Sequence, residues 1–303
     1  MQIASIVFYT CNFFNAGLGG FLFAAFFISW GSEMGQLTKL RQSIMTLFNA
    51  RQIDESDLDW ILVSVLGISR SETRKDRSLT ESEIKKISKF AKKRFQGFPL
   101  SQVLGEVEFY GLRFDVNRHV LSPRPETELL VEIIKDNESG NRGLDIGTGS
   151  GAIAVSLAKL GECKMVAVDV SHRALKVARS NAEKHNACVK FIKSDLFSRI
   201  GEDFDFIVSN PPYIKTGDIF YLDTEVKDHE PVLALDGGKT GLQFYERIIS
   251  DAPKFLVDGG RIYFEVGVGQ AGDVAKLLQN EFTNIIIKKD YNNIERIVMA
   301  TKK

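Results

Sequence analysis

The chain has 303 residues, of which 44% are hydrophobic and 26% charged, with 39 basic and 39 acidic side chains. This composition is typical of a globular protein long enough for one large domain and a small one. Zero net charge argues against a protein that stays bound to nucleic acid, because phosphate binding requires an excess of basic side chains. The best local basic cluster, Lys92 to Arg94, is interpreted as the solvated face of a helix.

The cysteines and histidines show no pattern of a metal site. Cys11, Cys163 and Cys188 are odd in number and lack ligand spacing, and the four histidines are scattered. We therefore expect a reducing compartment, the cytoplasm, and no bound metal.

Residues 1–33 are left out of the fold assignment. They include an apolar run over 21–28, but they lack the basic residues of a signal peptide, and polar residues and glycines interrupt a spanning helix. Met34 follows directly and begins an ordinary helical pattern. We interpret 1–33 as an extension upstream of the true start of the protein, and a membrane anchor is the alternative.

Residues 34–98 are predicted to form a small helical domain. Apolar residues recur at helical spacing in three stretches, and either Asp54 or Ser56 can cap the second helix. The third helix is the best marked, because Thr80-Glu-Ser-Glu83 forms a capping box. The domain carries no catalytic constellation, so we expect it to dock the substrate.

A β-hairpin is predicted within the linker 99–122. The apolar period changes to two between Gly105 and Val120, with Gly111 at the turn. The remaining residues, 123–303, are expected to form the larger domain.

The proline-bracketed segment 122–128 opens this larger domain. Arg124, Glu126 and Thr127 could face a polar ligand there. A helix entry with proline at its first turn explains the same residues equally well, and the sequence leaves both open.

The segment Gly143–Ala152 predicts a short strand, a glycine-rich turn and a helix. Glycines let the backbone approach a ligand at a helix N-terminus, where unpaired N–H groups favour carboxylate or phosphate. A second strand over 164–169 ends at Asp169, at the place where an acid binds a ribose hydroxyl pair. The same glycines fit a dinucleotide fingerprint, so alone they discriminate weakly.

Strands and helices then alternate to the C-terminus. The crossover rule predicts a Rossmann-like, mostly parallel sheet of seven strands with helices on both faces. Five of its strands are predicted at 189–193, 205–209, 261–266, 285–288 and 296–300, and the helices between them at 171–185, 241–257 and 269–281.

The strand 205–209 ends in Asn210-Pro-Pro-Tyr213. Prolines fix φ and cannot donate, so the carbonyls of Asn210 and Pro211 are held rigid and left free to accept. The Asn210 amide and the flat ring of Tyr213 complete a set that could hold a planar NH2 group. A strand that merely ends in a proline loop is the structural alternative.

These residues resemble the class I S-adenosylmethionine-dependent methyltransferases, and more narrowly the HemK/PrmC family. That family methylates the glutamine side-chain amide in the Gly-Gly-Gln motif of peptide chain release factors. The resemblance runs from about Gln36 to the C-terminus, and its motifs are Ser122–Glu128, the glycine loop, Asn-Pro-Pro-Tyr and Glu230–Leu235. Residues 1–33 match nothing in the family.

The resemblance also implies a site. Asn210, Pro211 and Tyr213 act in catalysis, and these three with Pro212 bind the substrate amide. Asp169 holds the ribose, and Asp195 and Leu196 flank the adenine, where many relatives stack an aromatic ring and Leu196 offers ordinary apolar packing. The residues implied to bind the cofactor are Gly147, Thr148, Gly149, Ser150, Gly151, Asp169, Asp195, Leu196 and Asn210. No metal is implied, because the sulfonium supplies the electrophile.

Other functions remain open at this stage. A nucleic-acid base aminomethyltransferase uses the same tetrapeptide but is expected to show a basic groove. A dehydrogenase needs a second mononucleotide-binding half and a hydride-transfer acid, and neither is evident. A non-catalytic adaptor predicts damaged motifs, whereas Asp169, Asn210 and Tyr213 are intact. A ribosomal-protein glutamine is the alternative substrate within the family. We expect a cytoplasmic monomer that acts on release factors, without stable nucleic-acid binding and without a membrane.

Overall fold

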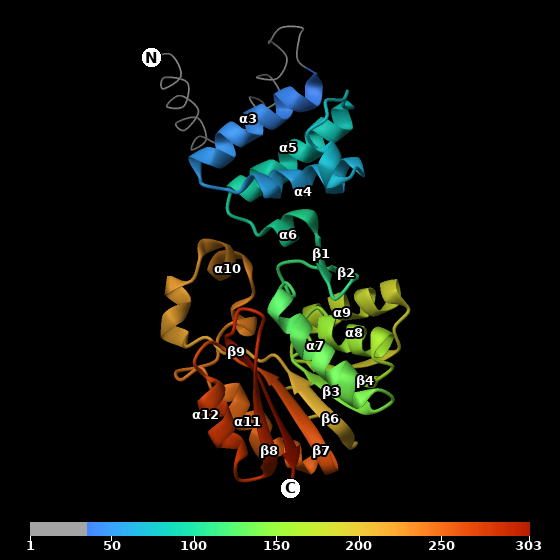
Figure 1. The fold of residues 1–303 in the computed structure, drawn as a ribbon, viewed down its shortest axis with the longest axis vertical. Coiled ribbons are helices and arrows are strands. Elements are labelled where there is room, and N and C mark those ends of the chain that lie inside the picture. The colour runs from blue at the N-terminus through green and yellow to red at the C-terminus, as the bar shows by residue number, and fades with distance from the viewer. Residues whose placement is uncertain (1–34) are drawn as a thin grey trace. The chain divides into compact units, whose positions relative to one another are not determined.

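The computed structural model describes residues 35–303, and the interpretation of 1–33 lies outside the described residues. Contacts divide the chain into two compact units at Leu104 and Gly105 (Figure 1). The helical domain was expected to end at residue 98, and the structure continues the first unit through one more short helix, Leu100–Leu104.

The described part of the first unit is helical. It contains α3 (Gln36–Ala50), α4 (Glu55–Leu66), η1 (Arg70–Glu72), α5 (Glu81–Phe95) and α6 (Leu100–Leu104). Asp54, and not Ser56, is the N-cap of α4, and its carboxylate accepts from the Ser56 N–H at 2.7 Å. The Thr80 hydroxyl accepts from the Glu83 N–H, and the Glu83 carboxylate accepts from the Thr80 N–H, so the capping box begins α5 as its spacing indicates.

A buried acid ties this unit together. Asp59 of α4 accepts from Arg41 of α3 at 2.7 Å and from the Thr73 hydroxyl at 2.9 Å, and only 3% of the residue is exposed. Buried charges need such partners, because their lost hydration is expensive. Asp59 therefore joins two helices and the segment after η1.

We expect Asp59→Ala to lower the free energy of unfolding by about 3 kcal/mol, the low end for breaking a buried ion pair, because Arg41 keeps Glu55 as a second partner. Chemical denaturation of the full chain measures it. Lys85→Ala is the control, since its pair with Glu81 is exposed and should contribute little. Equal stability of the two variants would contradict the role given to Asp59.

The second unit contains a seven-stranded sheet of order β5-β4-β3-β6-β7-β9-β8, in which all strands but β9 run parallel. Its strands are β3 (Arg142–Ile146), β4 (Lys164–Asp169), β5 (Val189–Lys193), β6 (Phe204–Ser209), β7 (Leu256–Glu265), β8 (Phe282–Lys289) and β9 (Glu295–Lys302). Its longer helices are α7 (Pro125–Glu138), α8 (Ala152–Leu160), α9 (His172–His185), α11 (Gln243–Asp251) and α12 (Ala271–Leu278). The predicted Rossmann-like sheet is thereby confirmed.

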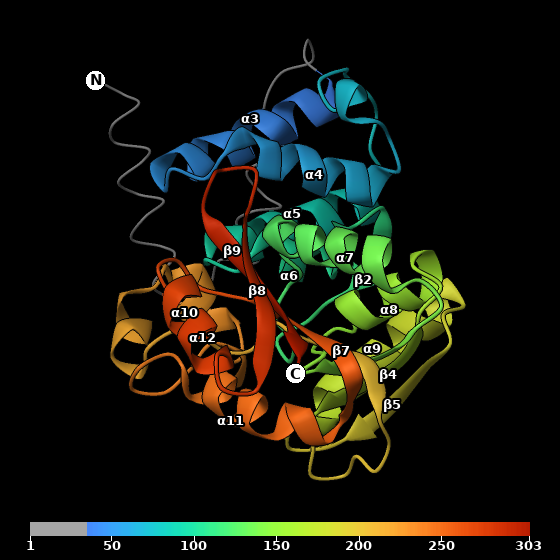
Figure 2. The ribbon, with the colours of Figure 1, turned by 60° about the horizontal axis from the view of Figure 1, so that its bottom comes forward.

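Helices cover both faces of this sheet. Figures 1 and 2 show α7, α8 and α9 on one side and α11 and α12 on the other. Alternate residues of each central strand enter opposite cores: Met165 and Ala167 pack with α7 and α8, whereas Val166 and Val168 pack with α11 and α12. Burial on both faces explains why these strands are continuously apolar.

Two segments depart from the sequence expectation. The helix expected over 241–257 ends at Asp251, because Pro253 has no N–H to continue the ladder, and a 3-10 turn over Ala252–Lys254 leads into β7. The predicted hairpin forms as β1 (Glu106–Phe109) and β2 (Leu112–Asp115) and belongs to the second unit.

Candidate active site

The carboxyl ends of four adjacent strands meet at one edge of the sheet. Strands β4, β3, β6 and β7 are neighbours and parallel, so the segments that follow them lie side by side. Ligands of open α/β sheets bind at this edge. The glycine loop follows β3, Asp169 ends β4, Asn210 follows β6 and Glu265 ends β7.

The glycine loop after β3 depends on backbone that only glycine adopts readily. Gly147, Gly149 and Gly151 have φ values of 75°, 56° and 83°. The N–H groups of Gly147 and Thr148 both donate to the Val168 carbonyl, at 2.9 and 3.0 Å, so the loop folds over the end of β4. This places the loop beside Asp169 and at the N-terminus of α8.

Asp169 holds the glycine loop through a hydrogen bond. Its two carboxylate oxygens accept from the N–H groups of Gly149, at 2.9 Å, and Ser171, at 2.8 Å. Each oxygen keeps a further lone pair for a ligand hydroxyl. Burial raises the pKa of Asp169 above its ordinary value, and the two N–H donors oppose that rise.

Asp145, one residue before the end of β3, is a member of this edge that sequence reasoning missed. It is 1% exposed, its Oδ2 accepts from the Thr148 hydroxyl at 2.6 Å, and its Oδ1 has no partner among the described residues. Burial raises its pKa to about 7. The available signal was an acid inside an otherwise apolar strand.

Asp195 and Leu196 follow β5 at the next position along the edge. Asp195 is exposed, and Arg247 of α11 donates through Nη2 to both of its oxygens at 3.0 Å. The Leu196 side chain packs against the core of the sheet, and its φ is 48°. The Leu196 carbonyl accepts from the Ser194 hydroxyl at 2.8 Å.

Neighbouring loops pack against the Asn-Pro-Pro-Tyr stretch and hold it in place. Gly237 lies so close that an added Cβ would be 2.8 Å from the Pro212 carbonyl oxygen, and the Gln270 amide donates to the Tyr213 carbonyl at 3.0 Å. Burial raises the pKa of Tyr213 to about 12, so its ring is neutral. Within residues 35–303, no group donates to the Pro211 carbonyl.

A buried polar cluster adjoins Asn210. Its side-chain Nδ2 donates to the Thr127 hydroxyl at 3.4 Å, and the polar groups of Thr127 and Asn210 both lower the pKa of the neighbouring Glu265 carboxyl. Glu265 is 2% exposed, its Oε2 has no partner among the described residues, and burial raises its pKa to about 7. Sequence reasoning missed Glu265, whose only signal was an acid at the end of a buried strand.

The segment 122–128 is a helix entry, and the facing of a polar ligand by Arg124, Glu126 and Thr127 stays a prediction. Pro125 is the first residue of α7, so the segment is a helix entry, while Thr127 faces Asn210. Arg124 donates to Glu230 at 2.7 Å. This pair fastens the segment to the excursion between β6 and α11, which the bridge of Ile214 with Asp236 closes at its base.

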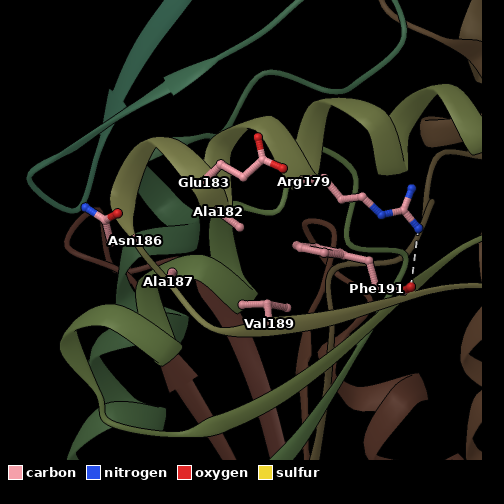
Figure 3. Close-up of a pocket in the computed structure, with 7 residues that line it drawn as sticks. All are labelled: Arg179, Ala182, Glu183, Asn186, Ala187, Val189 and Phe191. Carbon is pink, nitrogen blue, oxygen red and sulfur yellow. Dashed lines mark hydrogen bonds between the residues drawn. The ribbon is translucent and has the colours of Figure 1, made fainter.

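A separate hollow of about 480 Å³ lies elsewhere (Figure 3). It is lined by the second half of α9 and the beginning of β5, the end of that strand opposite to the glycine loop and Asn210. Arg179 there donates to the Phe191 carbonyl at 3.3 Å.

Among the described residues, no cluster of histidine, cysteine and acids suits a metal ion, and no helix is long and apolar enough to cross a membrane.

Comparison with solved structures supports the fold. The chain is similar to a methyltransferase from Pyrococcus furiosus, with a TM-score of 0.51 and 22% identity over 64% of this chain and 90% of that one. It is also similar to the catalytic domain of hMettl16, with a TM-score of 0.53 and 18% identity over 75% of this chain and 85% of that one.

Relatives found by sequence are more similar to this chain than these two structures are. The family model "Methyltransferase small domain" matches residues 125–225. The release factor glutamine methyltransferase of Geobacter sulfurreducens is 40% identical over 80% of this chain and 87% of its own length. The enzyme of the same name from Thermodesulfovibrio yellowstonii is 36% identical over 89% of this chain and 99% of its own length.

The sheet, its glycine loop and the matching methyltransferase model define a class I methyltransferase, whose methyl donor is S-adenosylmethionine. Within that class, the chain belongs to the release factor glutamine methyltransferase family. The predicted fold class, family and cofactor are confirmed.

Proposed function

We propose that this protein transfers a methyl group from S-adenosylmethionine to the side-chain amide nitrogen of the glutamine in the Gly-Gly-Gln motif of peptide chain release factors. The names of its relatives support this substrate. The observation that carries the proposal is the rigid Asn210–Tyr213 stretch at the end of β6, whose neighbour β3 leads into the glycine loop. It offers acceptors for a planar NH2 group beside the place of the methyl donor.

The cofactor fits the groups at this edge. S-adenosylmethionine, when bound, supplies an electrophilic methyl group on a positively charged sulfur. The unpartnered Oδ1 of Asp145 beneath the glycine loop is suited to the positive end of an amino acid, and the N-terminus of α8 to its carboxylate. We assign cofactor binding to Gly147, Thr148, Gly149, Ser150, Gly151, Asp169, Asp195, Leu196 and Asn210.

The protein's task is to aim a poor nucleophile. A carboxamide nitrogen shares its lone pair with its carbonyl, so holding both hydrogens in fixed directions lowers the cost of alignment. We assign these two hydrogen bonds to the Asn210 side-chain oxygen and the Pro211 carbonyl, with the Tyr213 ring and Pro212 against the amide plane. These acceptors take no proton beforehand. The N–C bond would form as the methyl carbon–sulfur bond breaks, and the nitrogen would then release its proton to water.

We also propose that the helical domain 34–98 docks the protein substrate and that the chain works as a cytoplasmic monomer without stably bound nucleic acid or membrane. The balance of 39 basic and 39 acidic residues supports the statement on nucleic acid. In this proposed organisation α6 belongs with the docking unit and the hairpin with the catalytic unit, Gly105–Lys303.

The test is incubation with labelled S-adenosylmethionine and a purified release factor, followed by peptide mass mapping. We expect one methyl group on the glutamine of the Gly-Gly-Gln motif. The control is the same release factor with that glutamine replaced, which should take up no label. Ribosomal protein and RNA are offered in parallel reactions, and label found only on one of these would replace the proposed substrate by the alternative.

A further inference from the structure

The side-chain NH2 of Asn210 points toward polar groups in the protein interior. Its Nδ2 carries two hydrogens, and it faces two buried acceptors, the Thr127 hydroxyl and the Glu265 carboxyl. The Thr127 hydroxyl accepts from Asn210 Nδ2, so its single hydrogen is left for the Glu265 carboxyl, whose pKa Thr127 lowers. The cluster is therefore a directed chain of donors that ends at a carboxylate.

The direction of this chain depends on the ion at its end. A carboxylate can only accept hydrogen bonds, so it forces Thr127 and Asn210 to donate toward it. The oxygen and nitrogen ends of a carboxamide have the same shape, and only their partners decide which end faces which way. Without the carboxylate, either end of Asn210 could face the substrate.

We propose that Glu265 and Thr127 are positioning residues that hold the Asn210 side chain with Nδ2 inward, so that Oδ1 is the atom presented to the substrate nitrogen. This inference rests on the proposed function. There the Asn210 side-chain oxygen and the Pro211 carbonyl form a clamp on the glutamine NH2, so Asn210 must present an acceptor to the substrate. An Asn210 turned the other way would oppose its own NH2 to that of the substrate. The buried cluster thus selects the productive orientation before the substrate arrives.

The position of Glu265 matches this role. It is the last residue of β7, the neighbour of β6, while Thr127 lies in the first turn of α7. Its Oε2 has no partner among the described residues and is inaccessible to solvent. No ion pair among these residues therefore offsets the desolvation cost of this buried acid. Glu265 is buried and acts through Asn210, so it is a positioning residue and not a catalytic one.

The charge of Glu265 is sensitive to pH near neutrality. Burial raises its pKa to about 7, the Thr127 and Asn210 donors and Arg296 of β9 lower it, and Glu126 of α7 raises it. Tyr213 and Tyr245 also interact with it, and both stay neutral because burial raises their pKa. Below about pH 7, the protonated carboxyl can donate, and the chain then loses its direction.

The first test compares Thr127→Val with Thr127→Ser. Valine keeps the shape of the side chain and removes the hydroxyl, and serine keeps the hydroxyl. We expect valine to lower kcat roughly 10- to 100-fold, the size of effect seen when the hydrogen-bond partners that orient metal ligands are removed. Serine should restore most of the rate, and the dissociation constant for S-adenosylmethionine should stay constant in both. Equal rates in the two variants would overturn the proposal.

The second test uses Glu265→Gln. The wild-type kcat should fall as pH decreases through the pKa of about 7, because protonation removes the acceptor-only end of the chain. Glutamine does not titrate, so the variant should lose this dependence and turn over more slowly above pH 7. An unchanged pH profile in the folded variant would assign the titration to another group and contradict the role of Glu265.

A third measurement needs no activity. The two side-chain amide protons of Asn210, assigned by nuclear magnetic resonance with Asn210→Ala as reference, should be protected from exchange in the free protein and exposed in Thr127→Val. Absent protection in the wild type would overturn the positioning role, even if release factors are methylated. Intact protection in a protein that fails to methylate release factors would instead count against the proposed function alone.

Discussion

Replacement of Asn210 with alanine is expected to lower the rate of methyl transfer by about 100-fold or more, the usual loss when one preorganised polar contact to the reacting group is removed. The affinity for S-adenosylmethionine should fall only slightly, because Asn210 is one of nine residues assigned to the cofactor and the glycine loop and Asp169 are held by their own backbone hydrogen bonds. Single-turnover kinetics with a release factor measure the first quantity, and calorimetry measures the second.

Asn280→Ala is the matched control, because it removes an amide from an exposed position after α12. It should leave both the rate and the affinity unchanged. If Asn210→Ala methylates the release-factor glutamine at the parental rate while folded and binding cofactor, the clamp is wrong. The Asn-Pro-Pro-Tyr stretch is then only the end of a strand.

Asp169→Ala should weaken binding of S-adenosylmethionine at least 100-fold. Each charge-assisted hydrogen bond to a ribose hydroxyl is expected to contribute ~1.5–3 kcal/mol, and the variant loses two of them. The change also removes the acceptor for the Gly149 N–H, which loosens the loop that we propose holds the other end of the cofactor. Isothermal calorimetry on the folded variant gives the affinity directly.

Asp251→Ala provides the comparison for this variant, since that acid ends α11 and pairs with the exposed Lys254. Its affinity for the cofactor should equal that of the parent. A folded Asp169→Ala protein with parental affinity would remove Asp169 from the site and leave the acid at the end of β4 as a support for the loop only.

The two buried acids at this edge explain why the site sits where it does. Asp145 lies one residue before the end of β3 and Glu265 ends β7, on the two strands that flank β6, and burial raises the pKa of each to about 7. Such groups destabilise the folded protein when ionised, so they are concentrated where a ligand or a reacting group gains from them. In this protein one would serve the cofactor and the other the substrate clamp.

The parts of this protein that the sequence alone determined are those written in contiguous residues. The capping box before α5, the three glycines after β3 and the prolines after Asn210 each restrict their own backbone, so their local structure follows from the residue types. The alternation of strands and helices likewise implies a covered parallel sheet, because right-handed crossovers allow few other arrangements.

Only the tertiary structure decided which polar groups share one environment. Asn210 meets Thr127 across 83 residues of chain, and Arg124 meets Glu230 across 106. Glu265 looks in the sequence like any acid at a strand end, and its burial, its raised pKa and its control over Asn210 come from α7 and β6 packing beside it. Local backbone preferences reach a few residues, whereas burial and hydrogen-bond direction depend on neighbours that the folded sheet alone brings together.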